Sequence, residues 1–123
     1  EARLSVGDVD YICAHATGTP VGDGVEALGI HALFGNAIRP AVASLKGMVG
    51  HELWMAGAAQ VVYCVLMASN GFTVASVNFE RPDQYSEKLR ILTERLDRPP
   101  RTVLCNSAGF GGTNACLALR LCS

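Results

Sequence analysis

The sequence predicts an α/β fold in which helices cover a mixed sheet, and three observations predict it. Short β-rich runs alternate with longer stretches of helical spacing, in the order strand, helix, strand, helix. The chain then ends with two β-rich runs that suit a pair of strands, residues 102–105 and 115–121. Half of the 123 residues are hydrophobic, which is enough for a sizeable core in one domain or part of one.

The first strand and helix follow from local signals. Residues 9–13 are β-rich and short enough for a strand. Residues 23–34 carry apolar side chains at helical spacing, and Gly35 ends the pattern. Asp23 is placed to cap this helix, and Glu26 follows at the capping-box spacing.

The second half of the pattern repeats the alternation. Residues 41–44 predict a strand and residues 45–50 a loop. A helix follows from about Leu53 or Ala56 to Ser69, and Asn70-Gly71 stops it. This helix is apolar almost all round, so we expect structure on both sides of it. A helix that is covered on both sides needs a larger hydrophobic core than 123 residues normally form. Beyond it, residues 74–79 are expected to be extended, and residues 89–93 suit a short strand.

Composition excludes several function classes. The formal net charge is −1 with no basic stripe, so we expect no nucleic-acid partner. By the sequence pattern we expect no apolar run to reach the roughly 18 residues of a membrane span, because the nearest candidate, residues 56–69, is shorter and contains Gln60. Five cysteines without a CxxC pair argue against zinc and against a disulfide framework. We interpret them as structural thiols of a cytoplasmic protein, with no metal site.

The first loop with chemical potential is residues 15–20, His-Ala-Thr-Gly-Thr-Pro, directly after the first strand. It places the His15 imidazole beside the hydroxyls of Thr17 and Thr19, at a strand end where α/β proteins hold their sites. The alternative is a histidine that only ends a strand.

The second loop is residues 46–51, Lys-Gly-Met-Val-Gly-His. Lys46 and His51 lie five residues apart on a turn with two glycines, so their side chains can converge. His51 precedes a long helix, whose positive dipole end favours a neutral imidazole. Taken alone, the pair could also be a helix-capping histidine and a solvated lysine.

The third loop is residues 109–114, Gly-Phe-Gly-Gly-Thr-Asn. Its glycines, including Gly109 and Gly111, free backbone N–H groups to face an oxyanion, and the Phe110 ring suits a gate. A tight turn between strands is an equal alternative. Together with Glu26 as a partner for the lysine, the loops predict stabilisation of negative charge on a carbonyl oxygen. No GxSxG or P-loop occurs, and the nucleophile is not evident.

These residues resemble the C-terminal portion of the β-ketoacyl-acyl-carrier-protein synthases, condensing enzymes of the thiolase-like fold. The family shows a His-Gly-Thr-x-Thr-Pro loop, a Lys-x-Met-x-Gly-His loop and an Asn-Ser-Phe-Gly-Phe-Gly-Gly-Thr-Asn loop. Here they read as residues 15–20, 46–51 and 106–114. The likeness covers the whole chain and is closest to the type I elongating synthases of bacterial fatty-acid synthesis, with modular polyketide synthases close by.

The resemblance implies that residues 1–123 form a C-terminal synthase domain, which is one half of a layered α/β/α thiolase-like fold. It implies an acyltransferase that condenses an acyl thioester with malonyl-acyl-carrier protein and releases carbon dioxide. The nucleophilic cysteine of the family lies in the N-terminal half, so we expect this chain to be inactive alone. The implied partners are acyl carrier protein, the missing N-terminal half and a second copy in a homodimer. No cofactor is implied.

The resemblance also assigns roles to residues. His15 and His51 stabilise the enolate, Lys46 supports the site and is oriented by Glu26, and the Phe110 N–H joins the oxyanion hole while its ring gates acyl access. Substrate-binding residues are Thr17 and Thr19, for the phosphopantetheine arm, together with Gly109 and Gly111.

Some residues depart from the family pattern. Ala16 and Ala108 replace a usual glycine and phenylalanine, and Trp54 stands where glycine is usual. We hypothesise that Trp54 changes acyl-chain preference. Two other interpretations stay open: a non-catalytic partner subunit like the chain-length factors, which lack the cysteine, and a degradative enzyme of the thiolase type. The presence of His15, Lys46 and His51 favours the condensing enzyme.

Overall fold

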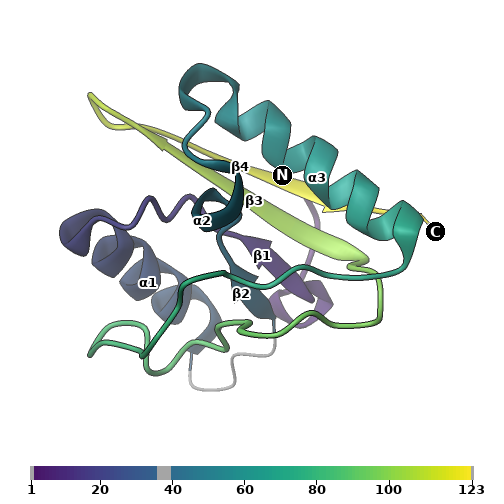
Figure 1. The fold of residues 1–123 in the computed structure, drawn as a ribbon, viewed down its shortest axis with the longest axis horizontal. Helices are drawn as coiled ribbons and strands as arrows, with labels where there is room; N and C mark the ends of the chain where they lie inside the picture. The colour runs from purple at the N-terminus through teal and green to yellow at the C-terminus, as the bar shows by residue number, and fades with distance from the viewer. Residues whose placement is uncertain (1, 36–39, 123) are drawn as a thin grey trace.

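The computed structural model describes residues 2–35 and 40–122, and Figure 1 shows their arrangement. The sheet of these residues has the strand order β2-β1-β3-β4. Its strands are β1 (Tyr11–Cys13), β2 (Ala41–Ala43), β3 (Thr102–Gly109) and β4 (Thr113–Arg120). The helices are α1 (Pro20–Phe34), α2 (Lys46–Val49) and α3 (Ala56–Asn70). β1 pairs in parallel with β2 and β3, and β4 pairs antiparallel with β3, so the predicted mixed sheet is confirmed.

The two long helices cover opposite faces of the sheet (Figure 1). Successive side chains of a strand point to opposite faces. Tyr11 and Cys13 of β1 accordingly join the core cluster that contains Cys64 and Met67 of α3. Ile12, between them, belongs to a second cluster with Ile30 of α1. The order helix, sheet, helix confirms the expected α/β/α layering.

The first helix begins earlier than the sequence pattern indicated. α1 starts at Pro20, with Thr19 as the N-cap residue, because proline is suited to the first helical position. Asp23 therefore lies inside the first turn, and the expected cap and capping box at Asp23 and Glu26 are wrong. Both carboxylates are directed at the preceding loop instead.

Three expectations about extended segments need correction. β3 continues to Gly109, four residues beyond its predicted end, because the antiparallel pairing with β4 runs into the glycine-rich segment. Residues 89–93 form no strand and contribute only an isolated parallel bridge between Ile91 and Val42. Residues 74–79 join no strand of the sheet.

The apolar segment before Gly71 is longer than residues 56–69, the nearest candidate for a membrane span in the sequence. A 3₁₀ turn, Leu53–Met55, leads into α3, so Leu53–Asn70 forms 18 helical residues with a mean hydropathy of 1.3. The expectation that no segment has the length and composition of a membrane span is therefore wrong for this one. Buried helices of proteins without membrane spans meet the same criterion, and α3 packs its Cys64 and Met67 onto the sheet.

Candidate active site

Glu26 anchors the loop that carries His15. Its two carboxylate oxygens accept hydrogen bonds from the backbone N–H groups of His15 and Ala16, each at 2.8 Å. The side-chain amide of Asn106, on β3, donates to the same carboxylate at 3.0 Å. One side chain on α1 thus joins the end of β1 to the end of β3, and it fixes the direction in which His15 leaves the sheet.

Asp23 anchors the rest of the same loop. Its Oδ1 accepts from the backbone N–H groups of Thr17, Gly18 and Thr19, at 3.0 to 3.2 Å. The Thr17 and Thr19 hydroxyl oxygens lie 3.2 Å apart, with Thr19 at the surface. Sequence reasoning assigned Asp23 only a capping role. The signal that could have revealed more was an aspartate four to six residues after three successive loop residues, whose backbone N–H groups need acceptors.

The second loop contains a short helix that the sequence pattern did not indicate. α2 begins at Lys46 and ends before Gly50, whose φ of 81° lets the chain turn toward His51. Gly47 packs so closely on the chain at Val77 that a Cβ there would lie 3.0 Å from the Val77 carbonyl oxygen. This contact holds α2, and with it Lys46, against the segment that follows α3.

The two imidazoles meet, as the sequence predicts. The ring centroids of His15 and His51 lie 5.6 Å apart with the planes at 82°, an edge-to-face arrangement. Nδ1 of His51 accepts a hydrogen bond from the backbone N–H of Leu53 at 3.1 Å. A neutral His51 therefore carries its proton on Nε2, which becomes a donor.

Burial and the charge of Lys46 disfavour the protonated, cationic form of His15. The pKa of His15 is lowered, first by burial and then by the nearby Lys46 ammonium. Burial also lowers the pKa of Lys46, which is half-buried. A neutral His15 imidazole beside a cationic lysine can donate a hydrogen bond to a developing oxyanion.

The expected orienting contact between Lys46 and Glu26 is not present. The Lys46 Nζ is buried without a hydrogen-bond partner among the described residues, while Glu26 is bound to two backbone N–H groups and Asn106. Glu26 acts on Lys46 only through its charge, which opposes the lowering of the Lys46 pKa. The physical reason is that two free backbone donors and an amide occupy both carboxylate oxygens.

The glycine-rich segment is the turn of the β3–β4 hairpin. Gly109 pairs with Thr113, and the N–H of Gly112 donates to the Gly109 carbonyl oxygen at 3.3 Å. Gly111 has a φ of 87°, which glycine adopts without strain. Phe110 lies at the tip with its side chain fully exposed. The expected roles of the Phe110 N–H, Gly109 and Gly111 toward an oxyanion or substrate stay predictions.

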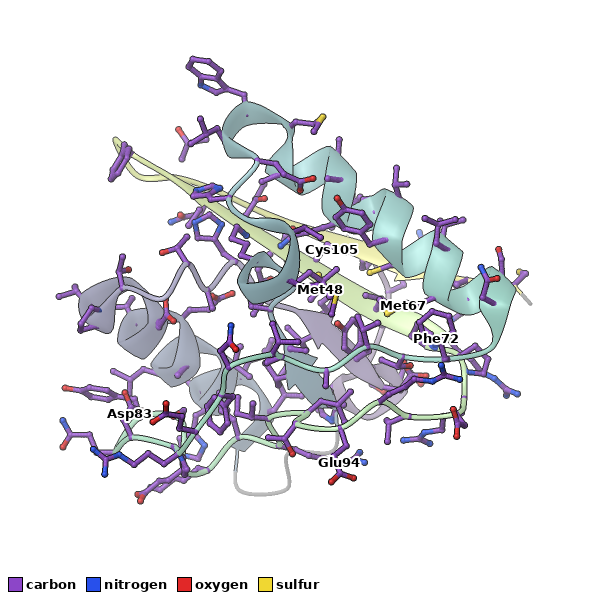
Figure 2. The ribbon with its side chains drawn as sticks, viewed as in Figure 1. Met48, Met67, Phe72, Asp83, Glu94 and Cys105 are labelled. Atoms are coloured by element: carbon purple, nitrogen blue, oxygen red, sulfur yellow. The ribbon has the colours of Figure 1, made fainter. Side chains whose placement is uncertain are left out.

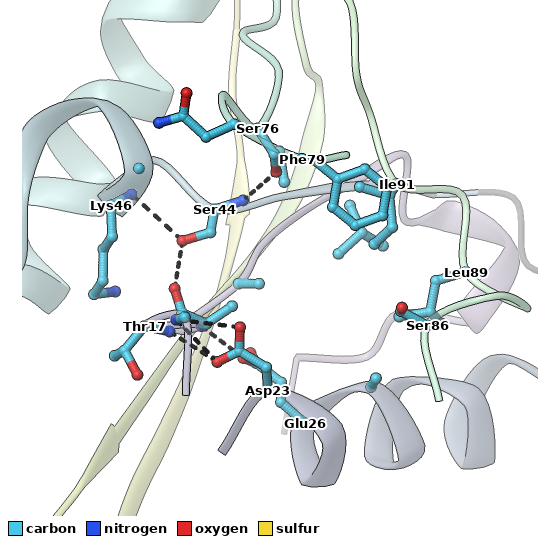
Figure 3. A pocket seen from close by; sticks show the side chains of 18 of the residues that line it. Thr17, Asp23, Glu26, Ser44, Lys46, Ser76, Phe79, Ser86, Leu89 and Ile91 are labelled. Carbon is cyan, nitrogen blue, oxygen red and sulfur yellow. Dashed lines mark hydrogen bonds between the residues drawn. The ribbon is translucent and has the colours of Figure 1, made fainter. Parts of the chain in front are cut away.

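A cleft of about 430 Å³ lies beside these loops, between α1, the end of β2 and the chain after α3. Figure 3 shows Thr17, Asp23, Glu26 and Lys46 lining one part of it, with Phe79 and Ile91 on another. The two imidazoles are not part of its lining. Within the described ranges, no group of three or more His, Cys, Asp or Glu side chains is arranged to hold a metal ion.

Comparison with solved structures places this arrangement among ketosynthases. The ishigamide ketosynthase/chain length factor superposes with a TM-score of 0.89 at 29% identity, over 98% of this chain and 30% of that one. A β-ketoacyl synthase from Burkholderia phymatum gives 0.89 at 28% identity, over 98% and 29%. The thiolase-like fold of these neighbours is therefore the fold of this chain.

The family follows from sequence. The model of the family described as "Beta-ketoacyl synthase, C-terminal domain" matches residues 1–80, which include His15, His51 and Lys46. The chain belongs to the β-ketoacyl synthase family. It is 45% identical over 112 residues to 3-oxoacyl-[acyl-carrier-protein] synthase 1 of Escherichia coli K12, covering 91% of this chain and 27% of that protein. The mitochondrial 3-oxoacyl-[acyl-carrier-protein] synthase of Arabidopsis thaliana is 37% identical over 95% of this chain and 26% of its own length.

The chain thus spans just over a quarter of these β-ketoacyl synthase relatives. It matches their C-terminal domain, as the three loop motifs predict, and the resemblance to the bacterial synthases is confirmed.

Proposed function

We propose that this chain provides the charge-stabilising part of a decarboxylative condensation site. The observation that carries the proposal is the pair of imidazoles of His15 and His51, 5.6 Å apart at the ends of β1 and α2. The lowered pKa of His15 and the Nε2 proton of His51 suit both rings to donate hydrogen bonds to one oxyanion. The relatives named 3-oxoacyl-[acyl-carrier-protein] synthase support this assignment.

The reaction divides into two steps. The malonyl thioester loses its carboxylate as carbon dioxide, and the electrons of the broken C–C bond form an enolate. Imidazole N–H groups next to the thioester oxygen would lower this barrier, as donors aimed at developing charge do. The enolate carbon then attacks an acyl thioester on a cysteine, a C–C bond forms, and the cysteine thiolate leaves. Lys46 would add positive charge to the same region.

The nucleophilic cysteine is proposed to lie outside this chain. Cys13, Cys64 and Cys105 are buried in the core, and the exposed Cys116 and Cys122 lie in and just after β4. Residues 1–123 would then be the C-terminal part of a larger synthase. Its proposed partners are acyl carrier protein and a second copy, and its proposed location is the cytoplasm. One solved relative, 28% identical, is a ketosynthase in complex with its acyl-carrier protein.

The proposal is tested in the intact synthase that contains this segment. We expect His15→Asn and His51→Asn each to reduce decarboxylation of malonyl-carrier protein by about 10²–10³-fold, the usual effect of removing one oxyanion donor. Transfer of an acyl group to the nucleophilic cysteine should change far less. Thr113→Ser, at the hairpin, is a control. Decarboxylation at the unaltered rate in both histidine variants would contradict the proposal.

A non-catalytic partner subunit is the second candidate. The structural neighbour named as a ketosynthase/chain length factor supports this second candidate. Incubation of the intact protein with acyl-carrier thioester, followed by mass spectrometry, separates the two. A stable acyl adduct on a cysteine outside residues 1–123 supports the enzyme. An adduct on one of the five cysteines here contradicts the proposed location of the nucleophile, and no adduct at all favours the partner subunit.

The hypothesis that Trp54 changes acyl-chain preference can be tested within the proposed function. The Trp54 side chain is fully exposed in the turn that links His51 to α3. In the intact enzyme, Trp54→Gly should shift the acyl-chain lengths that are elongated fastest, and Trp54→Phe should shift them less. An unchanged chain-length profile in both variants would contradict this hypothesis.

A further inference from the structure

Three cysteines gather in the core directly behind the site. Cys13 ends β1, and it lies opposite Cys105 in the parallel pairing of β1 with β3. Cys64, on α3, covers them from one face of the sheet, and all three belong to one core cluster. Figure 2 shows Cys105 between the sheet and α3, on the side where Met67 also points. None of the three has a role in the proposed condensation.

The sulfur atoms are close and already paired by hydrogen bonds. Sγ of Cys64 and Sγ of Cys105 lie 3.8 Å apart, and Cys13 shares hydrogen bonds with both. A disulfide has a length of about 2.05 Å, so the two sulfurs must approach by less than a van der Waals radius. Hydrogen bonding with Cys13 and Cys64 lowers the pKa of Cys105 and favours its thiolate, which is the nucleophilic form.

We propose that Cys64 and Cys105 form an oxidation site, which a hydroperoxide converts into a disulfide between α3 and β3. The Cys105 thiol first gives up its proton, the thiolate attacks the peroxide, and the O–O bond breaks. A sulfenic acid and a hydroxide form, and the hydroxide takes up the released proton to become water. Sγ of Cys64 then attacks the sulfenic sulfur, the S–O bond breaks, and the oxygen leaves as water with the Cys64 proton. Two thiols are oxidised and one hydrogen peroxide is reduced to two waters.

The bridge would connect two elements that position the imidazoles. α3 follows the turn that links it to His51. β3 continues from Cys105 into Asn106, which donates to the Glu26 carboxylate that anchors the His15 loop. Closing the sulfur–sulfur distance draws α3 toward β3. The two elements are already tightly packed, because a Cβ on Gly57 would lie 3.0 Å from the Ser107 Oγ. Close-packed interiors transmit such shifts. The ring signals of His15 and His51 should therefore change on oxidation, and return on reduction.

The test uses the chain with Cys116→Ser and Cys122→Ser, which leaves only the three buried cysteines. It is treated with hydrogen peroxide, blocked with an alkylating reagent, and digested with trypsin, which places Cys13, Cys64 and Cys105 in three different peptides. We expect an intact mass lower by two hydrogen atoms, one cross-linked peptide pair joining Cys64 to Cys105, and alkylated Cys13. The readout does not depend on activity, so it is independent of the proposed condensation.

Variants and a denatured control complete the design. Cys13→Ala should still form the bridge, and Cys64→Ala should not. In concentrated urea the three possible pairings should appear together, because the native placement is lost. A bridge that includes Cys13 in the folded protein, oxidation to sulfinic acid without a bridge, or no reaction with the fold intact would each overturn the proposal.

Discussion

Of the five buried side-chain polar atoms without a hydrogen-bond partner among the described residues, three belong to His15 and to residues near it. Nδ1 of His15, Nζ of Lys46 and Oε1 of Gln60 are buried and have no hydrogen-bond partner among the described residues. Gln60 donates through its other amide atom to the carbonyl oxygen of Ala14, the residue before His15. Each unsatisfied buried group costs about 1–3 kcal/mol. These unpaired groups lower the stability of this part of the chain, and under the proposed function they are available to bind a substrate.

The lowered pKa of His15 predicts a pH dependence of stability. The folded state keeps His15 neutral at a pH where the unfolded chain, with its pKa of about 6.5, already binds a proton. Falling pH below about 6.5 therefore favours the unfolded state at this residue. We expect His15→Gln to lose less unfolding free energy than the unaltered chain between about pH 7.5 and pH 5. Urea denaturation at both pH values measures the unfolding free energy of the two proteins. Equal losses would contradict the assignment of this pH dependence to His15.

Gly47 offers a test of the contact that holds α2. A Cβ there lies 3.0 Å from the Val77 carbonyl oxygen, so Gly47→Ala should cost about 1–3 kcal/mol in the free energy of unfolding. Gly29→Ala is the matched control, because nothing lies within 4 Å of a Cβ on Gly29 in α1. That control should gain about 0.5–1 kcal/mol by helix propensity. Urea denaturation compares the two, and a Gly47→Ala variant as stable as the original would refute the contact.

At the scale of elements, the first turns of α1 organise the loop before it. Asp23 and Glu26 lie three residues apart on one side of the helix, and together they bind five successive backbone N–H groups, residues 15–19. The loop is thereby kept in one conformation without regular secondary structure of its own. His15 and both threonines are positioned by a helix rather than by the strand that precedes them.

Glu26→Gln tests this anchoring. The amide keeps one acceptor oxygen but places a donor opposite a backbone N–H, so one charge-assisted hydrogen bond is lost, worth about 1.5–3 kcal/mol. We expect the amides of His15 and Ala16 to exchange with solvent roughly 10- to 100-fold faster. The exposed Glu94 provides the control, Glu94→Gln. Hydrogen exchange measured by NMR would refute the anchoring if both variants left these amides equally protected.

The elements differ in how well the sequence predicts them. Both long helices, the strands β1 and β2, and the convergence of His15 with His51 follow from periodicity and from the rule that sites lie at strand ends. α2 has four residues, which is too short for periodicity to reveal. The extension of β3 through residues 106–109 depends on its pairing with β4, and the carboxylate partners depend on which donors the folded loop leaves free. These features are tertiary and no local pattern specifies them.

At the scale of the whole molecule, the described residues leave much apolar surface uncovered. α3 exposes Val62, Val65 and Leu66, and α1 exposes Val25 and Leu28. Such surface is expected where a further layer of protein covers a helix. It agrees with the proposal that residues 1–123 are one part of a larger synthase.

The outer face of α3 can be tested directly. Val62 and Leu66 lie one turn apart and are about half exposed, at 55% and 50%. Val62→Gln with Leu66→Gln should reduce self-association of the chain and its binding of an apolar dye, with little change in stability. Val62→Ile with Leu66→Ile keeps the apolar area and is the control. Sedimentation velocity would contradict the interpretation if both pairs associated equally.

The chain carries a single tryptophan, and its side chain is fully exposed at the start of the helix that follows His51. Its fluorescence therefore reports on one place in the molecule. In the isolated chain the emission should lie near that of free tryptophan in water and be readily quenched by iodide. Any protein layer that covers this end of α3 should shift the emission to shorter wavelength. Trp54 is thus a built-in optical probe of whether the second layer has docked.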